Sequence, residues 1–310
     1  MPESNYENPR IDHEHQNGDP SKGQVRTDPK KVLWVGSMLS LGTIGSLYYI
    51  SIEAVILFTV FTLINICLGH SLGMHRLLIH RSFKCPKWLE YFLVHLGTVA
   101  GIAGPLTMLR THDIRDWSQR QTHCHNFFTQ VAPWYIDVYR QLFCKIELEE
   151  PPHLVIENEV SEDPVYQWME RTWRWQQLPW LLLLFLGGGI SWILWGICSR
   201  ISAITLGHWL IGYLAHNCGH KDWEVSAAAV QGHNVAWSSL LTMGECWHNN
   251  HHAYPGSANM GLFPGQMDLG WSTLQALEYI GLVRDLKTPA NLPERTDLVR
   301  LCLPDVQQGG

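Results

Sequence analysis

The 310-residue chain has few charged residues and no organised cysteine pattern. Asp, Glu, Lys and Arg make up only 16% of it, whereas hydrophobic residues make up 46%, and 15 residues are Trp. The eight Cys are scattered and form no CxxC pair, which argues against a disulfide framework, an iron–sulfur cluster and a zinc ribbon. The net charge is −6 and no basic stripe is present, so nucleic-acid binding has little support.

A cleavable secretion signal is also missing. The first thirty residues are polar, and no apolar segment precedes residue 32. Residues 1–31 are rich in Asn, Asp, Glu, Pro, Lys and Ser, so we expect a disordered cytoplasmic tail. His13 and His15 lie in this tail, and we expect both to be solvated.

The apolar residues are concentrated in blocks long enough to cross a bilayer. About 20 apolar residues span the hydrocarbon core as a helix. Four runs fit this requirement, near residues 32–50, 54–69, 178–198 and 201–215. A buried helical pair of a soluble protein is the alternative for the first two. We therefore predict an all-α integral membrane protein with four transmembrane helices.

The positions of Lys and Arg predict how the spans are oriented. The short links at 51–53 and 199–200 contain one basic residue, Arg200, whereas the tail, the middle loop and the C-terminal part hold nearly all the others. By the positive-inside tendency, both termini are cytoplasmic. Residues 70–177 and 216–290 would form a cytoplasmic helical cap on a domain that covers residues 32–290, and residues 291–310 would be a C-terminal tail.

Histidine is clustered in two parts of the chain. Of 17 His, seven lie between residues 70 and 125 and seven between 208 and 252. Such clustering is expected if two distant segments contribute to one metal site. Both clusters lie in the predicted cap and would therefore share one side of the membrane.

The strongest motif is the HxxHH of His248, His251 and His252. Residues at i, i+3 and i+4 share one face of a helix, and imidazole is a suitable ligand for Fe, Zn, Cu and Ni. An exposed polar turn is the alternative. The same stretch places Glu245 three residues before His248.

A second motif lies at the end of the second apolar run, where His75 and His80 are five residues apart. On a straight α-helix they would diverge, so we expect the helix to end or bend between them. Anchoring at the membrane interface is the alternative function. His70 is a weaker ligand candidate because it lies further into the apolar run.

Further candidate metal ligands lie in the polar segments that follow the second and the fourth apolar runs. His112 and Asp116 are four residues apart and could offer an imidazole and a carboxylate to one ion, although an ion pair of Arg115 with Asp113 or Asp116 is equally compatible. His216 ends the fourth run, where a histidine at the membrane boundary suggests a functional site. The remaining candidates are His123, His125, His220 and His233.

These motifs resemble the integral-membrane fatty acyl desaturases, in their Δ9, stearoyl-CoA-desaturase-like branch. The first box of that family is similar to the segment from His75 to Phe83, and the third box, GExWHNxHHxxP, is similar to the segment from Gly244 to Pro255. The resemblance covers residues 33–285. It implies a metal centre of seven histidines, namely His75, His80, His112, His216, His248, His251 and His252.

The second box departs from the family pattern. HRxHH falls on residues 112–116, so Arg115 and Asp116 stand where the family has histidine, and Gly212 stands where it has Asn. Asp116, His123 or His125 could replace the missing ligands. Otherwise one metal is held weakly, or the chemistry has changed.

The resemblance implies two iron ions, O2 as co-substrate and a cis double bond, at Δ9, in a saturated acyl chain bound to CoA or lipid. Two electrons would come from an external donor such as ferredoxin or cytochrome b5, because the chain has no haem or flavin motif. Glu245, Asp113 and Asp116 are candidates to orient the ligands through hydrogen bonds. A related hydroxylase or monooxygenase and a non-catalytic member of the fold are the alternatives. A zinc hydrolase is disfavoured because it would need fewer histidines.

Overall fold

The computed structural model describes residues 8–12 and 18–301, so His13 and His15 lie outside the described residues. The described chain is mostly helical. Its α-helices are α1 (Pro29–Tyr48), α2 (Ile52–Ile64), α3 (Lys87–Val99), α4 (Pro105–Arg120), α5 (Asn126–Thr129), α6 (Trp134–Phe143), α7 (Asn158–Ser161), α8 (Pro164–Thr172), α9 (Gln177–Ile193), α10 (Arg200–Asn217), α11 (Ser239–Thr242), α12 (His248–Ala253) and α13 (Leu269–Tyr279). Two π-helices, η1 (Asn65–Ile79) and η2 (Leu194–Ser199), and two 3-10 turns, η3 (Ala236–Ser238) and η4 (Pro289–Asn291), complete the helical elements.

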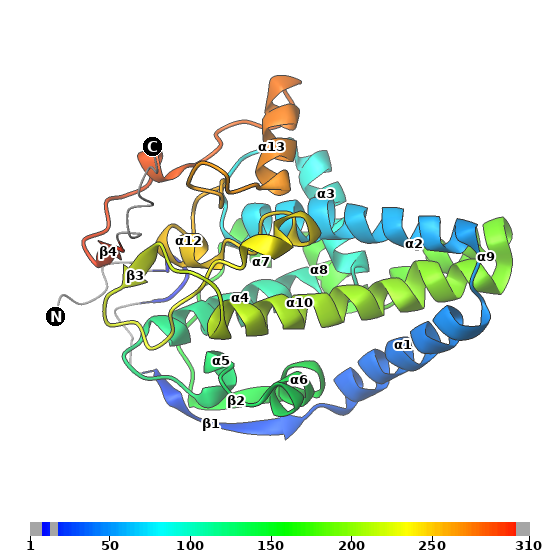
Figure 1. Ribbon diagram of the computed structural model, residues 1–310, viewed down its shortest axis with the longest axis horizontal. Helices are drawn as coiled ribbons and strands as arrows, with labels where there is room; N and C mark the ends of the chain where they lie inside the picture. Colours follow the sequence, from blue (N-terminus) through cyan, green and yellow to red (C-terminus); the bar gives the residue numbers. More distant parts are fainter. Residues whose placement is uncertain (1–7, 13–17, 302–310) are drawn as a thin grey trace, which may run out of the picture.

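Two helical segments are long and apolar enough to cross a membrane, by length and composition. The first, Ile52–Ile79, joins α2 to η1, and the second, Gln177–Asn217, joins α9, η2 and α10. Together with α1 they extend to one end of the molecule, whereas α12, β3 and β4 lie at the other end, and β1 and β2 run along the lower side of this view (Figure 1). Leucines on α9 such as Leu182, Leu183 and Leu186 are exposed, as expected for a surface that faces lipid.

The interior of this helical half is built from close contacts between α1 and η2. Leu184, Leu194, Ile197, Cys198 and Ile201 form its buried core. Where α1 and η2 meet, the Ser199 hydroxyl donates to the Gly42 carbonyl at 3.1 Å. A small residue on α1 lets the two backbones approach closely, which is typical of helix packing in membranes.

The third and fourth apolar runs reverse direction at a different place from the one predicted. The backbone leaves helical geometry at Gly188 and Gly189, where Gly189 has a φ of 62°, a conformation that glycine adopts readily. The predicted link at residues 199–200 is wrong. Arg200 instead begins α10 as a buried residue, and its guanidinium donates to Gln177 Oε1 at 2.7 Å and to Asn65 Oδ1.

The prediction of a purely helical protein with a disordered tail at residues 1–31 also needs correction. β1 (Asp19–Thr27) pairs antiparallel with β2 (Cys144–Glu150), and β3 (Trp223–Val225) pairs with β4 (Leu298–Arg300). The described part of the predicted tail is therefore ordered against the middle of the chain, and β4 lies in the predicted C-terminal tail. Residues 302–310 lie outside the described part.

η1 carries the first histidine motif and has π-helical hydrogen bonding. The His80 amide donates to the His75 carbonyl, five residues earlier, at 3.0 Å. Its neighbour α3 packs so closely that a Cβ on Gly69 would lie 2.5 Å from the Leu96 carbonyl carbon. Glycines on η1 thus allow the backbones of η1 and α3 to touch.

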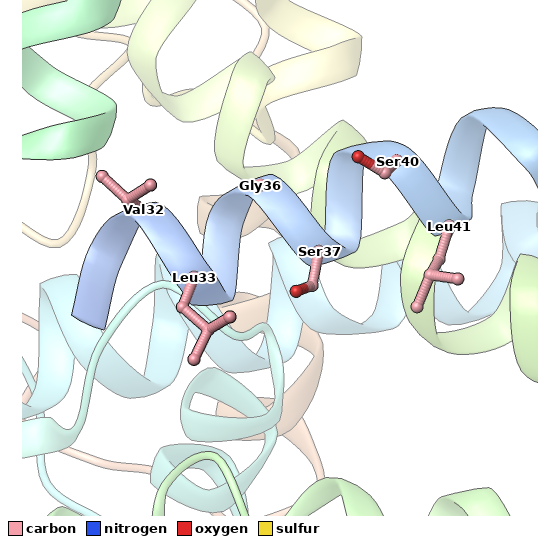
Figure 2. A pocket seen from close by; sticks show the side chains of 6 residues that line it. All are labelled: Val32, Leu33, Gly36, Ser37, Ser40 and Leu41. Atoms are coloured by element: carbon pink, nitrogen blue, oxygen red, sulfur yellow. The ribbon is translucent and has the colours of Figure 1, made fainter. Parts of the chain in front are cut away.

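A shallow hollow on α1 is lined by Val32, Leu33, Gly36, Ser37, Ser40 and Leu41 (Figure 2). These residues all belong to one helix, and none of them is titratable. Functional pockets usually combine an apolar lining with convergent polar groups. The chemistry of this protein must therefore be sought elsewhere, among the histidines.

Candidate metal centre

Four helical elements or their ends bring seven histidines together in two groups. The four-histidine group consists of His75, His80, His112 and His251, and the three-histidine group consists of His216, His248 and His252. Within each group, one ligand atom from each residue lies within 4.8 Å of the others. These are the same seven residues that the motifs predict as metal ligands.

The four-histidine group is assembled from η1, α4 and α12. The Nε2 atoms of His75 and His80 are 3.2 Å apart. The ring centroid of His251 lies 4.7 Å from the centroids of both of these rings, and that of His112 lies 5.2 Å from His75 and 4.8 Å from His80. The π-helical backbone explains how residues five apart reach one point, because its i→i+5 hydrogen bonds place them one above the other. The helix was predicted to end or bend between His75 and His80, and η1 does end between them, at Ile79.

The three-histidine group joins the end of α10 to α12. His248 Nε2 lies 3.2 Å from His216 Nε2 and 3.0 Å from His252 Nε2. His248 and His252 are four residues apart on α12 and therefore share a face of this helix.

The two groups adjoin each other through α12. His251 belongs to one group and its neighbours His248 and His252 belong to the other. The ring centroids of His248 and His251 are 5.9 Å apart. The HxxHH motif thus divides its three imidazoles between two adjacent positions, and does not supply them all to one.

The geometry and protonation of both groups fit a metal. An ion that holds two imidazole nitrogens at about 2.1 Å and at a right angle would separate them by about 3.0 Å, and the nitrogen pairs above are separated by 3.0–3.2 Å. Burial lowers the pKa of His248 to about 4 and, with the neighbouring imidazoles, lowers the pKa of His251 and His252 well below the usual value. The rings of His248, His251 and His252 are therefore neutral near pH 7, as metal ligation requires.

Glu245 orients the first histidine of the four-histidine group. Its Oε2 lies 2.5 Å from His75 Nδ1, and its Oε1 accepts from the Ser71 hydroxyl at 2.6 Å. Burial raises the pKa of Glu245, but His75 and the nearby Arg76 guanidinium outweigh it and hold the pKa below its usual value. A carboxylate on Nδ1 leaves Nε2 as the nitrogen with a free lone pair and makes it more basic.

Arg76 and Asp268 form a buried ion pair that the sequence did not reveal. Arg76 is completely buried, and its Nη2 donates to Asp268 Oδ1 at 2.9 Å. Asp268 also accepts from the Trp271 amide and so caps α13. No spacing rule links residues that are 192 positions apart, so only the folded chain identifies this pair.

The N-terminal segment reaches the metal centre through Arg10. This residue is buried, and its guanidinium donates to the Ile79 carbonyl at 2.7 Å, the Asp113 carboxylate at 3.3 Å and the Glu157 carboxylate at 2.8 Å. It therefore joins the end of η1, beside His80, to the residue after His112. The sequence suggested nothing of this role.

Asp116, a predicted replacement ligand, is paired with a cation in the structure. Arg120 Nε donates to Asp116 Oδ2 at 3.2 Å, and Arg120 Nη2 donates to the His252 carbonyl at 3.1 Å. Burial raises the pKa of Asp116, but Arg120 and His112 outweigh it, so the net shift is downward. Arg295 donates to the same His252 carbonyl at 3.0 Å, which ties the C-terminal segment to α12.

The other histidine candidates lie outside both groups. His70 packs edge-on against His208 at 4.8 Å between centroids, and His123 is exposed. His125 Nδ1 accepts from the Phe127 amide and caps α5. His220 lies 3.5 Å from Asp222, and His233 Nδ1 lies 3.2 Å from the Ala215 carbonyl oxygen.

Comparison with characterised proteins identifies the family. An sn-1 stearoyl-lipid 9-desaturase of Anabaena variabilis is 36% identical over 221 residues, covering 71% of this chain and 79% of that protein. An acyl-CoA 5-desaturase of Anemone leveillei is 30% identical over 305 residues, covering 91% of each chain. A Delta-9 acyl-lipid desaturase of Arabidopsis thaliana is 33% identical over 233 residues, covering 74% of this chain and 73% of that protein. No family model matches the chain.

The chain belongs to the Δ9 fatty acid desaturase family. It is an oxidoreductase with fatty acyl desaturase function. The histidine groups of this desaturase are compatible with metal binding, and its two long apolar segments are compatible with a membrane location.

Proposed function

We propose that this desaturase is a diiron enzyme that introduces a cis Δ9 double bond into a saturated acyl chain. The observation that carries the proposal is the convergence of seven histidines in two adjacent groups. The reaction consumes one O2, two electrons and two protons, removes one hydrogen from each of two neighbouring methylenes and forms two water molecules. Iron bound at these histidines would activate O2, a reaction that no side chain can perform.

The residues around the histidines prepare them for this role. Glu245 holds the proton of His75 on Nδ1, so that Nε2 faces the interior of the four-histidine group. Gln130 Oε1 accepts from His216 Nδ1 at 3.0 Å and directs the Nε2 of that ring toward His248. Arg120 and Arg295 hold the His252 carbonyl and so position α12. The ligand atoms would therefore be arranged before any ion arrives, which lowers the cost of binding.

We propose that the substrate is an acyl chain on a lipid or on CoA. The named relatives include stearoyl-lipid and palmitoyl-lipid 9-desaturases as well as acyl-CoA 5-desaturases. An acyl tail is apolar and would reach the histidines from the helical half of the molecule. The two electrons would come from an external partner such as ferredoxin or cytochrome b5.

We further propose four membrane crossings with both termini and the histidines on the cytoplasmic side. The crossings would be α1, the segment Ile52–Ile79 and the two limbs on either side of Gly188 and Gly189. Residues 32–290 would form the desaturase domain. This arrangement is supported by the concentration of Lys and Arg outside the short links.

Expression in a host that lacks its own desaturase tests the enzymatic proposal. Fatty-acid profiling by chromatography and mass spectrometry should show a new alkene with its double bond at carbon 9. His251→Ala and His252→Ala should abolish the product, whereas His153→Ala should not, because the His153 side chain is 63% exposed and pairs with Asp12. An added hydroxyl group, or full activity in either of the first two variants, would contradict the proposal.

A further inference from the structure

The two histidine groups differ in the partners that orient their rings. In the four-histidine group, a carboxylate oxygen of Glu245 lies 2.5 Å from His75 Nδ1, and a carboxylate oxygen of Asp113 lies 3.6 Å from His112 Nδ1. A carboxylate beside an imidazole increases its basicity and its affinity for a cation. This group therefore has four rings and one carboxylate in close contact with a ring, that of Glu245, whereas Asp113 is farther from its ring and also pairs with Arg10.

The three-histidine group has no comparable neighbour. Within residues 8–12 and 18–301, the imidazoles that form ion pairs with carboxylates are those of His75, His112, His153 and His220, so His216, His248 and His252 form none. The ring of His216 is oriented by Gln130, whose neutral Oε1 lies 3.0 Å from Nδ1. An amide adds far less basicity to the ring than a carboxylate would.

Arg115 weakens this amide partner further. Its Nη1 donates to the same Gln130 Oε1 at 3.0 Å, and its Nη2 donates to Gln141 Oε1 at 2.7 Å. The oxygen that orients His216 thus also accepts from a guanidinium. A positive charge lies near the Nδ1 side of the ring, where a negative charge would make the imidazole more basic. Arg115 is also three residues after His112, at one of the two positions where the motif HRxHH would carry a further imidazole.

We propose that the two groups bind metal unequally. The four-histidine group is the tight position, and the three-histidine group is a weaker position from which the ion exchanges readily. Loss of a partner that orients a ligand typically costs about 10–100-fold in metal affinity, and the second group lacks both such a carboxylate and a fourth ring. The inference rests on the proposed function, because it assumes that both groups are metal positions.

Titration of the metal-free, full-length protein in detergent with Co2+ tests the inequality. Visible absorption of bound Co2+ and metal analysis after equilibrium dialysis should resolve one tight ion per chain and a second ion bound at least about 10-fold more weakly. His80→Ala should remove the tight ion, whereas His216→Ala should remove only the weak one. Two ions of equal affinity would overturn the inequality but leave the proposed function intact. Absence of any bound Co2+ in both groups would overturn both.

A variant that should bind the second ion more tightly tests whether Arg115 weakens metal binding at the three-histidine group. Arg115→His removes the guanidinium and supplies an imidazole at the same position, so the weak ion should bind about 10-fold more tightly, with a shifted Co2+ spectrum and an unchanged tight ion. Arg110→His is the matched control, because Arg110 is an exposed arginine on the same helix. If Arg115→His retains the tight ion without strengthening the weak one, the role given to Arg115 is wrong. If this variant does not fold, the comparison of His80→Ala with His216→Ala still decides the inequality.

Discussion

At the scale of single residues, two histidines of the metal centre have a polar partner at Nδ1, on the far side of the ring from Nε2. The seven histidines supply the nitrogens, but their rings would rotate without partners. Glu245 and Gln130 provide these partners for His75 and His216. One partner is charged and the other is neutral, although both fix the same tautomer.

Replacement of Glu245 by Gln tests the contribution of the charge. The amide keeps a hydrogen-bonding atom near His75 Nδ1 but removes the negative charge, so the affinity of the four-histidine group should fall by about 10–100-fold. Metal analysis after dialysis would measure this loss. Glu224→Gln changes an exposed Glu on β3 and should leave metal content unchanged. Equal metal affinity in the two variants would show that the carboxylate is dispensable.

The role of Arg10 could not be predicted from the sequence, because its partners Ile79, Asp113 and Glu157 are distant along the chain. Removing its guanidinium in Arg10→Ala leaves the buried Asp113 without this cation and frees the Ile79 carbonyl at the end of η1. Breaking a buried ion pair typically costs about 3–5 kcal/mol. We expect a clear fall in the thermal denaturation midpoint of the purified protein, together with weaker metal binding at the four-histidine group. Arg26→Ala, which removes an exposed arginine of β1, should leave both properties near wild type.

At the scale of secondary structure, the π-helix η1 determines how the first motif works. An α-helix has about 3.6 residues per turn and would point residues five apart in different directions. The i→i+5 hydrogen bond between His80 and His75 brings both rings to one place. The close contact of η1 with α3 at Gly69 and Gly73 secures this segment.

Gly73→Ala should disturb this packing. A Cβ at residue 73 would collide with the Leu93 carbonyl of α3, and such overpacking typically costs about 1–3 kcal/mol. The detergent-solubilised variant should lose its folded state at a lower temperature and bind metal less well. Gly36→Ala is the control, because a Cβ at residue 36 on α1 would meet no atom within 4 Å. Identical behaviour of the two variants would argue against a tight η1–α3 contact.

At the scale of the whole molecule, the apolar helices extend to one end and α12, which carries the HxxHH motif, lies toward the other (Figure 1). α1, α2 and most of α10 extend to one end, where the links at residues 49–51 and 188–189 lie. β3, β4 and α12 lie at the other end. A membrane enzyme needs this arrangement if an apolar substrate is to pass along the helices to a metal centre at the edge of the bilayer.

Labelling of single cysteines would test the proposed membrane orientation. In a background with the exposed Cys218 changed to Ser, Ile50→Cys should react with a membrane-impermeant thiol reagent in intact cells, because Ile50 is exposed in the link between α1 and α2. Glu224→Cys should react only after the membrane is permeabilised. The reverse pattern would contradict the proposed orientation.

The sequence by itself determined which residues belong together at the metal centre. His75 with His80 and His248 with His251 and His252 stand in short motifs, the family resemblance adds His112 and His216, and all seven lie in the two groups of the structure. The apolar runs were likewise evident from composition, although the reversal at Gly188 and Gly189 was placed eleven residues too late, at residue 199. Arg200 looked like part of a link because its buried partners, Asn65 and Gln177, are distant in sequence.

Only the tertiary structure decided how these histidines are divided and held. The split of HxxHH between two groups depends on the position of α12 relative to η1 and α10, which no local spacing specifies. The partners Arg10, Asp268 and Gln130 come from segments far from the motifs, and their roles arise because burial forces each charge or polar atom to find a partner. Local geometry selects the ligands, whereas packing over long sequence separations sets the partners on which their affinity for metal depends.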